Sequence, residues 1–296
     1  MISSKKICKK FNLSHEGDEI FLGNVSTLSN PKDSSLIFIK DQKSLSEEVL
    51  NSLMKRNDIF LLLPNGFSID KIFHSHAFVE KPKNIFFSII EEYFIEKSHS
   101  EYICSSARID KKVKIGTNVF IDSNVFISGE CSIGDNVRIG KNCIINGPCT
   151  IGSNTTLCSN VMIGEESISV RYENDTPFIN RQLGGVVIGK FCRIGFNSAI
   201  AKGTIDNTII GNHVLMGEFN SVAHNSVVGD NTVLTVRTTI NGSCRVGKNC
   251  WFGPHSTIMS YLNIGNNIKL SANSVLYSSV KREGTYLGNP AKHFSI

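Results

Sequence analysis

The sequence predicts a mainly β protein: a small α/β domain followed by a parallel β-helix, in which the chain coils around a triangular prism. Two observations carry this prediction. An aliphatic residue recurs at every sixth position over the last two thirds of the 296-residue chain, whereas the first hundred residues show ordinary strand and helix patterns. Since repeats define an architecture before local propensity does, we expect the α/β domain over 1–100, the β-helix over 101–280 and a short tail over 281–296.

The N-terminal third contains two apolar runs, "SLIFIK" (35–40) and "DIFLLLP" (58–64), which are typical of buried strands. The segment "SLSEEVLNSLMKR" (44–56) opens on a serine with a glutamate three residues on, which indicates a helix N-terminus. "KPKNIFFSIIEEYFI" (81–95) has the pattern of a second amphipathic helix. Strands that alternate with helices predict a small α/β domain.

The repeat that follows has a period of six, which neither a helix nor an alternating strand produces. Its aliphatic positions fall into two long runs and a short one between them: Ile109, Ile115, Ile121, Ile127, Ile133, Ile139, Ile145, Ile151, Leu157 and Ile163; Ile188, Ile194 and Ile200; and Ile210, Met216, Val222, Val228, Leu234, Ile240, Val246, Phe252, Ile258, Ile264, Leu270 and Leu276. Three hexads make one triangular coil of 18 residues, and stacked coils pair as parallel strands about 4.8 Å apart.

The other hexad positions suit corners and a packed interior. Glycine and asparagine recur after the aliphatic residue, as in Gly134 and Asn136, and these residue types tolerate the left-handed backbone that a corner needs. Six cysteines stand two residues before an aliphatic position, where we expect them to fill the core as small apolar side chains. They are Cys131, Cys143, Cys149, Cys192, Cys244 and Cys250.

Residues 165–187, "EESISVRYENDTPFINRQLGGVV", interrupt the repeat and are expected to leave the prism as a loop. A loop of this length in a compact solenoid is usually either functional or disordered, and we favour a functional loop. Insertions on such scaffolds commonly build binding surfaces.

Composition excludes several classes of protein. No apolar stretch approaches the length of a membrane span, and the first residues lack the apolar core of a secretory signal. Nine cysteines with no CxxC pair favour neither a disulfide framework nor a zinc site, so we expect a reducing cytoplasm and no metal. A net charge of +5 is too small and dispersed to indicate a nucleic-acid partner.

One residue in the repeat is not required by the hexad pattern. His224 stands in "NSVAHNSVVG", where wall and corner residues explain its neighbours. Counting by 18 places Gly242 one coil above it and Asp206 one coil below, although the phase shifts between Ile200 and Ile210. Imidazole is the usual general base at neutral pH, a carboxylate can orient it, and a glycine N–H can bind an oxyanion. The column suits acyl transfer from a thioester to an amine or alcohol, while a structural histidine beside a turn aspartate is the alternative.

The hexapeptide repeat resembles the left-handed parallel β-helix acyltransferases, which are typically homotrimers with sites between adjacent prisms. Four stretches are similar to UDP-3-O-acylglucosamine N-acyltransferases: "GNVSTLSNPKDSSLIFIKDQKSL", "PFINRQLGGVVIG", "GTIDNTIIGN" and "SVAHNSVVGDNT". The resemblance implies that His224 is the general base and that the Gly242 amide binds the oxyanion, with Asp206 orienting the base. It also implies substrate contacts from Asn225, Gln182 and Tyr261, the last in place of a second histidine.

The same resemblance assigns uridine binding to the N-terminal domain, where this sequence departs from the family. Phe38 matches an aromatic that stacks on the base, whereas Asp41 and Ser44 replace an asparagine and a tyrosine. The family's glycine-and-aromatic stretch in the insertion is here "EESISV", and its helical C-terminal extension is absent, which favours a short acyl group on coenzyme A.

The function expected is therefore acyl transfer from a thioester of coenzyme A or acyl carrier protein to the amino group of a nucleotide-activated sugar. The product would serve a bacterial surface glycan or lipopolysaccharide, and the enzyme would be a cytoplasmic homotrimer without a permanently bound cofactor. The alternatives are O-acetyl transfer to a sugar hydroxyl and a non-catalytic β-helix that binds a nucleotide sugar.

Overall fold

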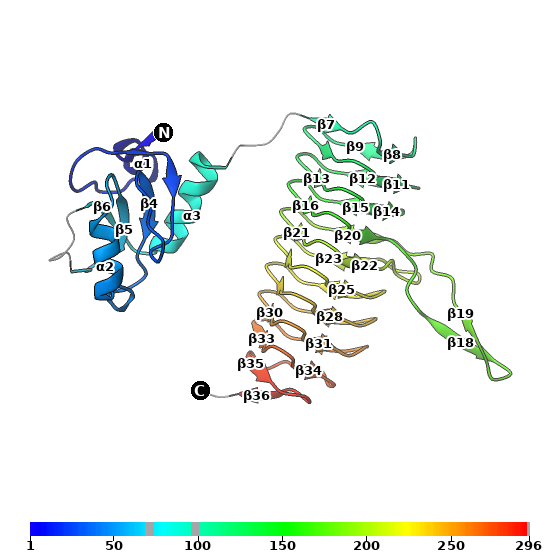
Figure 1. Cartoon of the computed structure of the whole chain (residues 1–296). Coiled ribbons are helices and arrows are strands. Elements are labelled where there is room, and N and C mark those ends of the chain that lie inside the picture. The colour runs from blue at the N-terminus through cyan, green and yellow to red at the C-terminus, as the bar shows by residue number, and fades with distance from the viewer. Residues whose placement is uncertain (69–73, 96–100, 295–296) are drawn as a thin grey trace. The chain divides into compact units, whose positions relative to one another are not determined.

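The computed structural model describes residues 1–68, 74–95 and 101–294. The chain divides into two compact units, Met1–Ser98 and His99–Ile296. Figure 1 shows the elements of each unit in chain order.

The first unit is built on a parallel sheet with the order β3-β4-β5-β6. A small antiparallel pair, β1 with β2, and three α-helices complete it, together with one short 3-10 helix, η1. In chain order the described elements are β1 (Ile2–Ser3), α1 (Ser4–Phe11), β2 (Phe21–Leu22), β3 (Asn24–Val25), β4 (Ser35–Phe38), η1 (Gln42–Ser44), α2 (Glu47–Met54), β5 (Phe60–Pro64), β6 (Ser75–Val79) and α3 (Pro82–Tyr93).

Alternate side chains of the central strands enter two different cores, which explains why both strands are apolar throughout. Phe60 and Leu62 of β5 pack in one cluster with Ile89 of α3, whereas Leu61 packs in the other with Leu53 of α2. A sheet covered on both faces needs near-continuous apolar strands. The runs predicted as strands are thereby confirmed.

Both helices predicted in this unit are present, with one change of cap. The N-cap of α2 is Ser46, whose hydroxyl accepts a hydrogen bond from the N–H of Val49. Ser44, the serine that opens the predicted segment, instead ends η1. Sequence patterns missed α1 because half of its residues are lysines, and β6 because it contains the polar residues Ser75 and His76.

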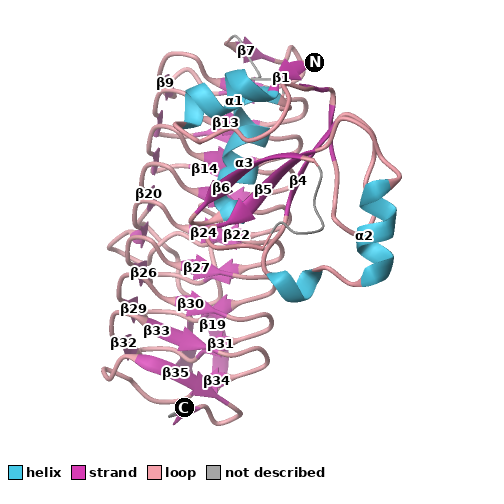
Figure 2. Cartoon of the chain, turned by 90° about the vertical axis from the view of Figure 1, so that its left-hand side faces the viewer, coloured by secondary structure: helices cyan, strands magenta, loops and turns pink. Residues whose placement is uncertain are grey.

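The second unit is a three-sided prism of stacked short strands, as Figure 2 shows. Over the described residues its faces hold 11, 9 and 8 strands, here called the first, second and third face. The first comprises β7 (Tyr102–Ile103), β10 (Phe120–Ile121), β13 (Arg138–Ile139), β16 (Thr156–Leu157), β21 (Arg193–Ile194), β24 (Leu215–Met216), β27 (Val233–Leu234), β30 (Trp251–Phe252), β33 (Ile268–Leu270), β35 (Gly284–Leu287) and β36 (Lys292–Phe294).

The remaining prism strands form the other two faces. The second comprises β8 (Arg108–Ile109), β11 (Phe126–Ser128), β14 (Ile144–Asn146), β17 (Met162–Ile163), β22 (Ala199–Ile200), β25 (Ser221–Val222), β28 (Thr239–Ile240), β31 (Thr257–Ile258) and β34 (Val275–Leu276). The third comprises β9 (Lys114–Ile115), β12 (Cys131–Ile133), β15 (Cys149–Ile151), β20 (Val186–Ile188), β23 (Thr208–Ile210), β26 (Val227–Val228), β29 (Arg245–Val246) and β32 (Asn263–Ile264).

Strand pairing confirms the predicted coil of three hexads. Ile121 pairs with Ile139, and Val222 pairs with Ile240, in each case the residue three hexads further along the chain. The aliphatic positions of the hexads line one continuous buried core. All six cysteines of the repeat are buried in it, and burial raises the pKa of the Cys143 thiol to about 11, so that a reactive thiolate is disfavoured there.

The insertion leaves the prism after β17 and returns at β20, two residues earlier than the sequence boundary at 187. It contains a hairpin of β18 (Val170–Glu173) and β19 (Thr176–Ile179), which projects from the prism in Figure 1. All eight hairpin residues are exposed.

The C-terminal segment differs from the tail expected over 281–296. β35 pairs in parallel with β33 and so extends the first face, and β36 folds back antiparallel on β35. β35 and β36 thus cover the end of the first face beyond β33.

Most corners hold an asparagine with positive φ, as at Asn136, whose φ is 57°. Its amide oxygen also accepts a hydrogen bond of 2.7 Å from the Asn118 amide one coil below. Since left-handed backbone costs a residue with a Cβ about 1–2 kcal/mol and asparagine and glycine least, the corner favours these residues.

Asn136→Val tests this explanation. We expect it to lower the free energy of unfolding by about 1–2 kcal/mol, because a β-branched residue is strained at positive φ. Asn136→Gly should cost less, because it loses only the amide ladder. Urea denaturation of the two variants measures the difference, and equal losses would assign the effect to the ladder instead.

Candidate active site

His224 lies at the corner between the second and third faces, two residues after the end of β25. Its imidazole covers Gly242, one coil above. A Cβ added to Gly242 would lie 2.8 Å from Nε2 and 2.9 Å from Cε1 of His224. Only glycine at this position leaves the ring its present place.

Gly242 also leaves backbone donors free at this corner. At corners after the third face, a polar side chain of the next coil accepts the equivalent N–H: Asp135 from Thr117 at 2.8 Å, and Asn266 from Lys248 at 2.8 Å. Gly242 has no side chain that could accept the backbone N–H of His224. Among the hydrogen bonds of the described residues, none uses the N–H of Gly242 itself. This N–H has no acceptor among those bonds, and its binding of an oxyanion stays a prediction.

The side chain of Asn225 sets the proton position on the imidazole. Its Oδ1 lies 3.0 Å from His224 Nδ1 and accepts the N–H of Thr204 at 3.0 Å, while its Nδ2 donates to the Asp206 carbonyl. With the amide held this way, an oxygen faces Nδ1, and Nδ1 must donate. Nε2, the nitrogen over Gly242, then carries the lone pair that a general base needs.

This arrangement changes the role expected of Asp206. Its backbone carbonyl holds the Asn225 amide, so the group that orients His224 is an amide rather than the Asp206 carboxylate. Asn225 was expected to contact substrate, but its side chain is instead engaged with the base.

The register below His224 explains why a regular count of three hexads was insufficient. Ile210 pairs with Val228 at the regular spacing of three hexads. Ile200 pairs with Val222, which lies more than three hexads further along the chain. The corner between these strands therefore contains four extra residues. Counting back from His224 by three hexads and these four residues gives Lys202, a neighbour that the sequence interpretation missed and that the phase shift could have identified.

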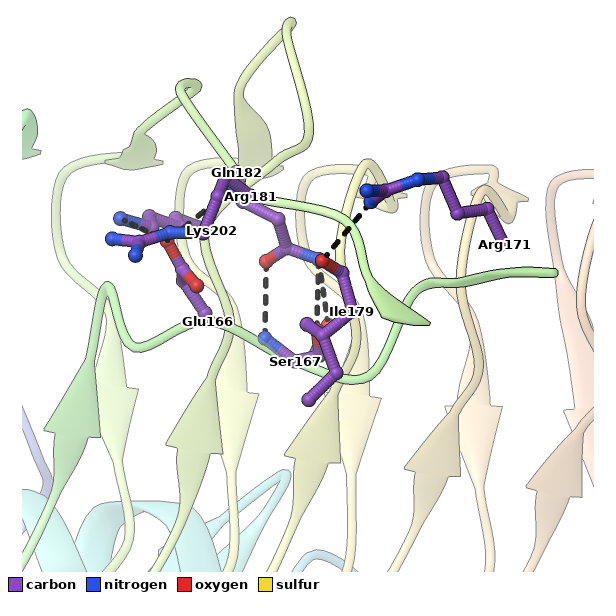
Figure 3. A network of polar contacts seen from close by, with 7 residues as sticks. All are labelled: Glu166, Ser167, Arg171, Ile179, Arg181, Gln182 and Lys202. Carbon is purple, nitrogen blue, oxygen red and sulfur yellow. Dashed lines mark hydrogen bonds and ion pairs between the residues drawn. The ribbon is translucent and has the colours of Figure 1, made fainter. Parts of the chain in front are cut away.

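Lys202 connects this corner to the insertion, as Figure 3 shows. Its Nζ lies 3.6 Å from Oε1 of Glu166, which also accepts the Arg181 Nε–H at 3.1 Å. Partial burial raises the pKa of Glu166, but the Gln182 N–H, Arg181 and Lys202 outweigh it and hold that pKa below its ordinary value. Glu166 is thus kept ionised between two cations.

Gln182 ties the two arms of the insertion together. Its side chain is almost fully buried, with Oε1 accepting the N–H of Ser167 at 3.0 Å and Nε2 donating to the Ser167 carbonyl at 3.0 Å (Figure 3). Both ends of the amide are used. The structure therefore gives Gln182 a structural role in place of the substrate contact expected of it.

Two further side chains flank the corner. Tyr261 lies one coil above Gly242, whose carbonyl accepts its N–H, and its ring is 76% exposed. Arg245 on β29 donates from Nη1 to the Asn225 carbonyl. Tyr261 was expected from the sequence, but nothing in the repeat distinguished Arg245 from other outward residues.

The uridine-binding residues expected in the first unit lie at the end of β4 and in the loop after it. The Phe38 ring packs on Phe86, with centroids 4.9 Å apart. The Asp41 carboxylate accepts the hydroxyl and N–H of Ser44, and these bonds, the hydroxyl first, lower the pKa of Asp41. Asp41 and Ser44 thus satisfy each other, which leaves the second Asp41 oxygen for a ligand.

Sequence comparison identifies the repeat. Residues 130–165 match the family model described as bacterial transferase hexapeptide (six repeats), and residues 244–278 match the hexapeptide repeat of succinyl-transferase. Two separate stretches of the prism are therefore similar to hexapeptide repeats of transferases. The fold of the second unit is the left-handed parallel β-helix predicted from the sequence.

Curated relatives share part of the prism. The chain is 29% identical over 130 residues to a UDP-3-O-acylglucosamine N-acyltransferase of Delftia acidovorans, which is 44% of this chain and 39% of that protein. It is 41% identical over 107 residues to the enzyme of the same name from Leptothrix cholodnii, covering 36% of this chain and 31% of that protein. These alignments span less than half of each relative.

A solved structure confirms the fold. The UDP-N-acetylglucosamine acyltransferase of Campylobacter jejuni superposes with a TM-score of 0.59 at 24% identity, over 66% of this chain and 75% of that one. No helix among the described residues is long and apolar enough to cross a membrane.

The tautomer of His224 is testable without knowledge of the reaction. In protein labelled with ¹⁵N-histidine, we expect the Nδ1 resonance of His224 to be that of a protonated nitrogen and Nε2 that of an unprotonated one. Asn225→Ala should produce a mixture of tautomers, because the acceptor is lost. His224→Gln assigns the resonances, and a protonated Nε2 in the wild type at neutral to alkaline pH would contradict the geometry.

Proposed function

We propose that the protein transfers an acyl group from a thioester to the amino group of a nucleotide-activated sugar, in the synthesis of a bacterial surface glycan or lipopolysaccharide. The single observation that carries this proposal is the His224 imidazole seated on Gly242, with Nε2 available as a base. The relatives, named for N-acyl transfer to an acylated UDP-glucosamine, support the class of acceptor.

The reaction divides into two steps at this corner. The sugar nitrogen attacks the thioester carbonyl carbon, its proton passes to Nε2 of His224, and the carbonyl oxygen becomes an oxyanion. The C–S bond then breaks, and the proton passes from His224 to the departing thiolate, which leaves an amide and a free thiol. Asn225 stabilises the imidazolium by accepting from Nδ1, while the Gly242 N–H stabilises the oxyanion.

The donor is a thioester of coenzyme A or acyl carrier protein. In this proposal the protein works in a reducing cytoplasm, which nine free cysteines favour, and requires no resident cofactor. Phe38 and the free oxygen of Asp41 are the nucleotide-binding groups proposed for the first unit.

A homotrimer completes the proposal, with the site between neighbouring prisms. Leu183 and Ile205 are 80% and 79% exposed, and the hydrogen bond of 2.8 Å from the Leu183 N–H to the Thr204 carbonyl brings their segments together just below His224. Exposed apolar side chains beside a site favour a covering partner, and closed symmetry places the same coils of neighbouring copies at one height.

His224→Ala tests the base. We expect kcat/KM for acylation of UDP- or dTDP-amino sugars to fall about 10²–10⁴-fold, with unchanged circular dichroism. His213→Ala, at a corner after the third face, is the matched control and should retain activity. A loss smaller than about tenfold would refute the assignment, and acylation of sugar hydroxyls alone would make the enzyme an O-acyltransferase.

Light scattering tests the assembly. The wild type should have the mass of three chains, and Ile205→Asp with Leu183→Asp should dissociate it, because burying unpaired carboxylates between subunits is costly. Met54→Asp, on the exposed side of α2, is the control. A monomeric wild type would remove the between-subunit site.

A further inference from the structure

A pocket of about 210 Å³ lies on the outer surface of the second face, beside the His224 corner. Its floor is formed by Ala199 and Ser221, its lower end by Met162, and its roof by residues 165–167 at the start of the insertion. Ala223, which directly precedes His224, also lines it. The pocket therefore reaches the residue next to His224.

The small size of two outward side chains creates this pocket. Strand pairing aligns one outward column along the face, and its members in order are Phe126, Ile144, Met162, Ala199, Ser221, Thr239, Thr257 and Val275. Alanine and serine are the smallest members and are adjacent, so the column is lowered over two coils. Met162 closes the lower end and Thr239 stands above.

The roof is held in place by the contacts drawn in Figure 3. Ser167 is fixed by the Gln182 amide, and Glu166 by Arg181 and Lys202. In addition, the Lys202 N–H donates to the Glu165 carbonyl at 3.1 Å. These contacts tie the roof both to the returning arm of the insertion and to the corner at Lys202.

The lining indicates the chemistry of the ligand. Its apolar side chains outside the prism core are Met162, Ala199, Ala201 and Ala223, since those of Ile200 and Val222 lie in the core. Its charged members are Glu165 and Glu166, with no lysine or arginine among the lining residues. Two carboxylates and no cation disfavour phosphate and nucleotide. An uncharged aliphatic group fits this surface.

We propose that this pocket receives the acyl group of the donor and restricts it to a short chain, an inference that rests on the acyl transfer proposed above. At about 30 Å³ for a group the size of a water molecule, the volume accommodates roughly seven heavy atoms. An acetyl, butyryl or hexanoyl group fits, and a dodecanoyl group does not.

Donor chain length tests the pocket. The wild type should use acetyl, butyryl and hexanoyl thioesters and reject dodecanoyl. Ala199→Leu, which fills the floor, should lower the ratio of kcat/KM for hexanoyl over acetyl by about tenfold or more, since one methylene in an apolar pocket changes discrimination by that order. Met162→Ala should raise use of octanoyl, because it removes the end wall.

Thr257→Leu is the matched control, an outward residue of the same column that does not line the pocket. It should leave the chain-length ratios unchanged. An Ala199→Leu protein whose ratios equal those of Thr257→Leu, or a wild type that prefers dodecanoyl, would overturn the pocket assignment while leaving acyl transfer itself intact.

Binding separates this proposal from the proposed function. S-butylpantetheine, a thioether that cannot transfer its chain, contains the part shared by both donor types. Ala199→Leu should weaken its binding about tenfold relative to pantetheine, and Thr257→Leu should not. If no donor supports transfer but this difference is observed, the proposed function fails and the pocket stands; equal weakening of both ligands refutes the pocket.

Discussion

Parallel hydrogen bonding between successive coils is the constraint on which the rest of this structure depends. Because each strand pairs with its counterpart in the next coil, residues at equivalent corners are stacked in columns. A column has a fixed rise of about 4.8 Å per coil, which is close enough for a side chain to cover the backbone above it. His224 and Gly242 are such a pair, and their contact requires no contribution from distant segments.

The same constraint explains how the site departs from the repeat. Stacking must be kept at the strands, so extra residues accumulate at corners, and here two consecutive coils widen at the same corner. The first widening is the insertion and the second is the four-residue expansion before Ile210. The return of the insertion bonds to the expansion through the Leu183 N–H and the Thr204 carbonyl, and the expansion holds Asn225. The His224 imidazole is therefore oriented by the part of the coil that breaks the period.

The fold was predictable because residues three hexads apart pair in neighbouring strands, so the spacing of the repeat directly reflects the pairing. The position of His224 over Gly242 was predictable for the same reason, since both lie in the uninterrupted region. The residue below His224 was not predictable, because four extra residues change the count. The group that faces His224 Nδ1 is the Asn225 amide and not the Asp206 carboxylate. The contacts of Gln182 differ from those expected, and Arg245 was missed. Both sets of contacts depend on loop geometry, which has no period. α1 was missed because its packing face has only a few apolar residues.

The widened corner also bears on how such a protein can diverge. His224 and Gly242 lie in coils stacked above the expansion, so loops below them can be lengthened, shortened or exchanged while the pair keeps its spacing. Changes in these loops can then alter substrate selection without changing the residues proposed for the reaction. Across relatives, residues that match by alignment in the upper coils can retain one reaction while the insertion evolves toward another substrate, and distance counted along the sequence becomes a poor guide to which residues correspond.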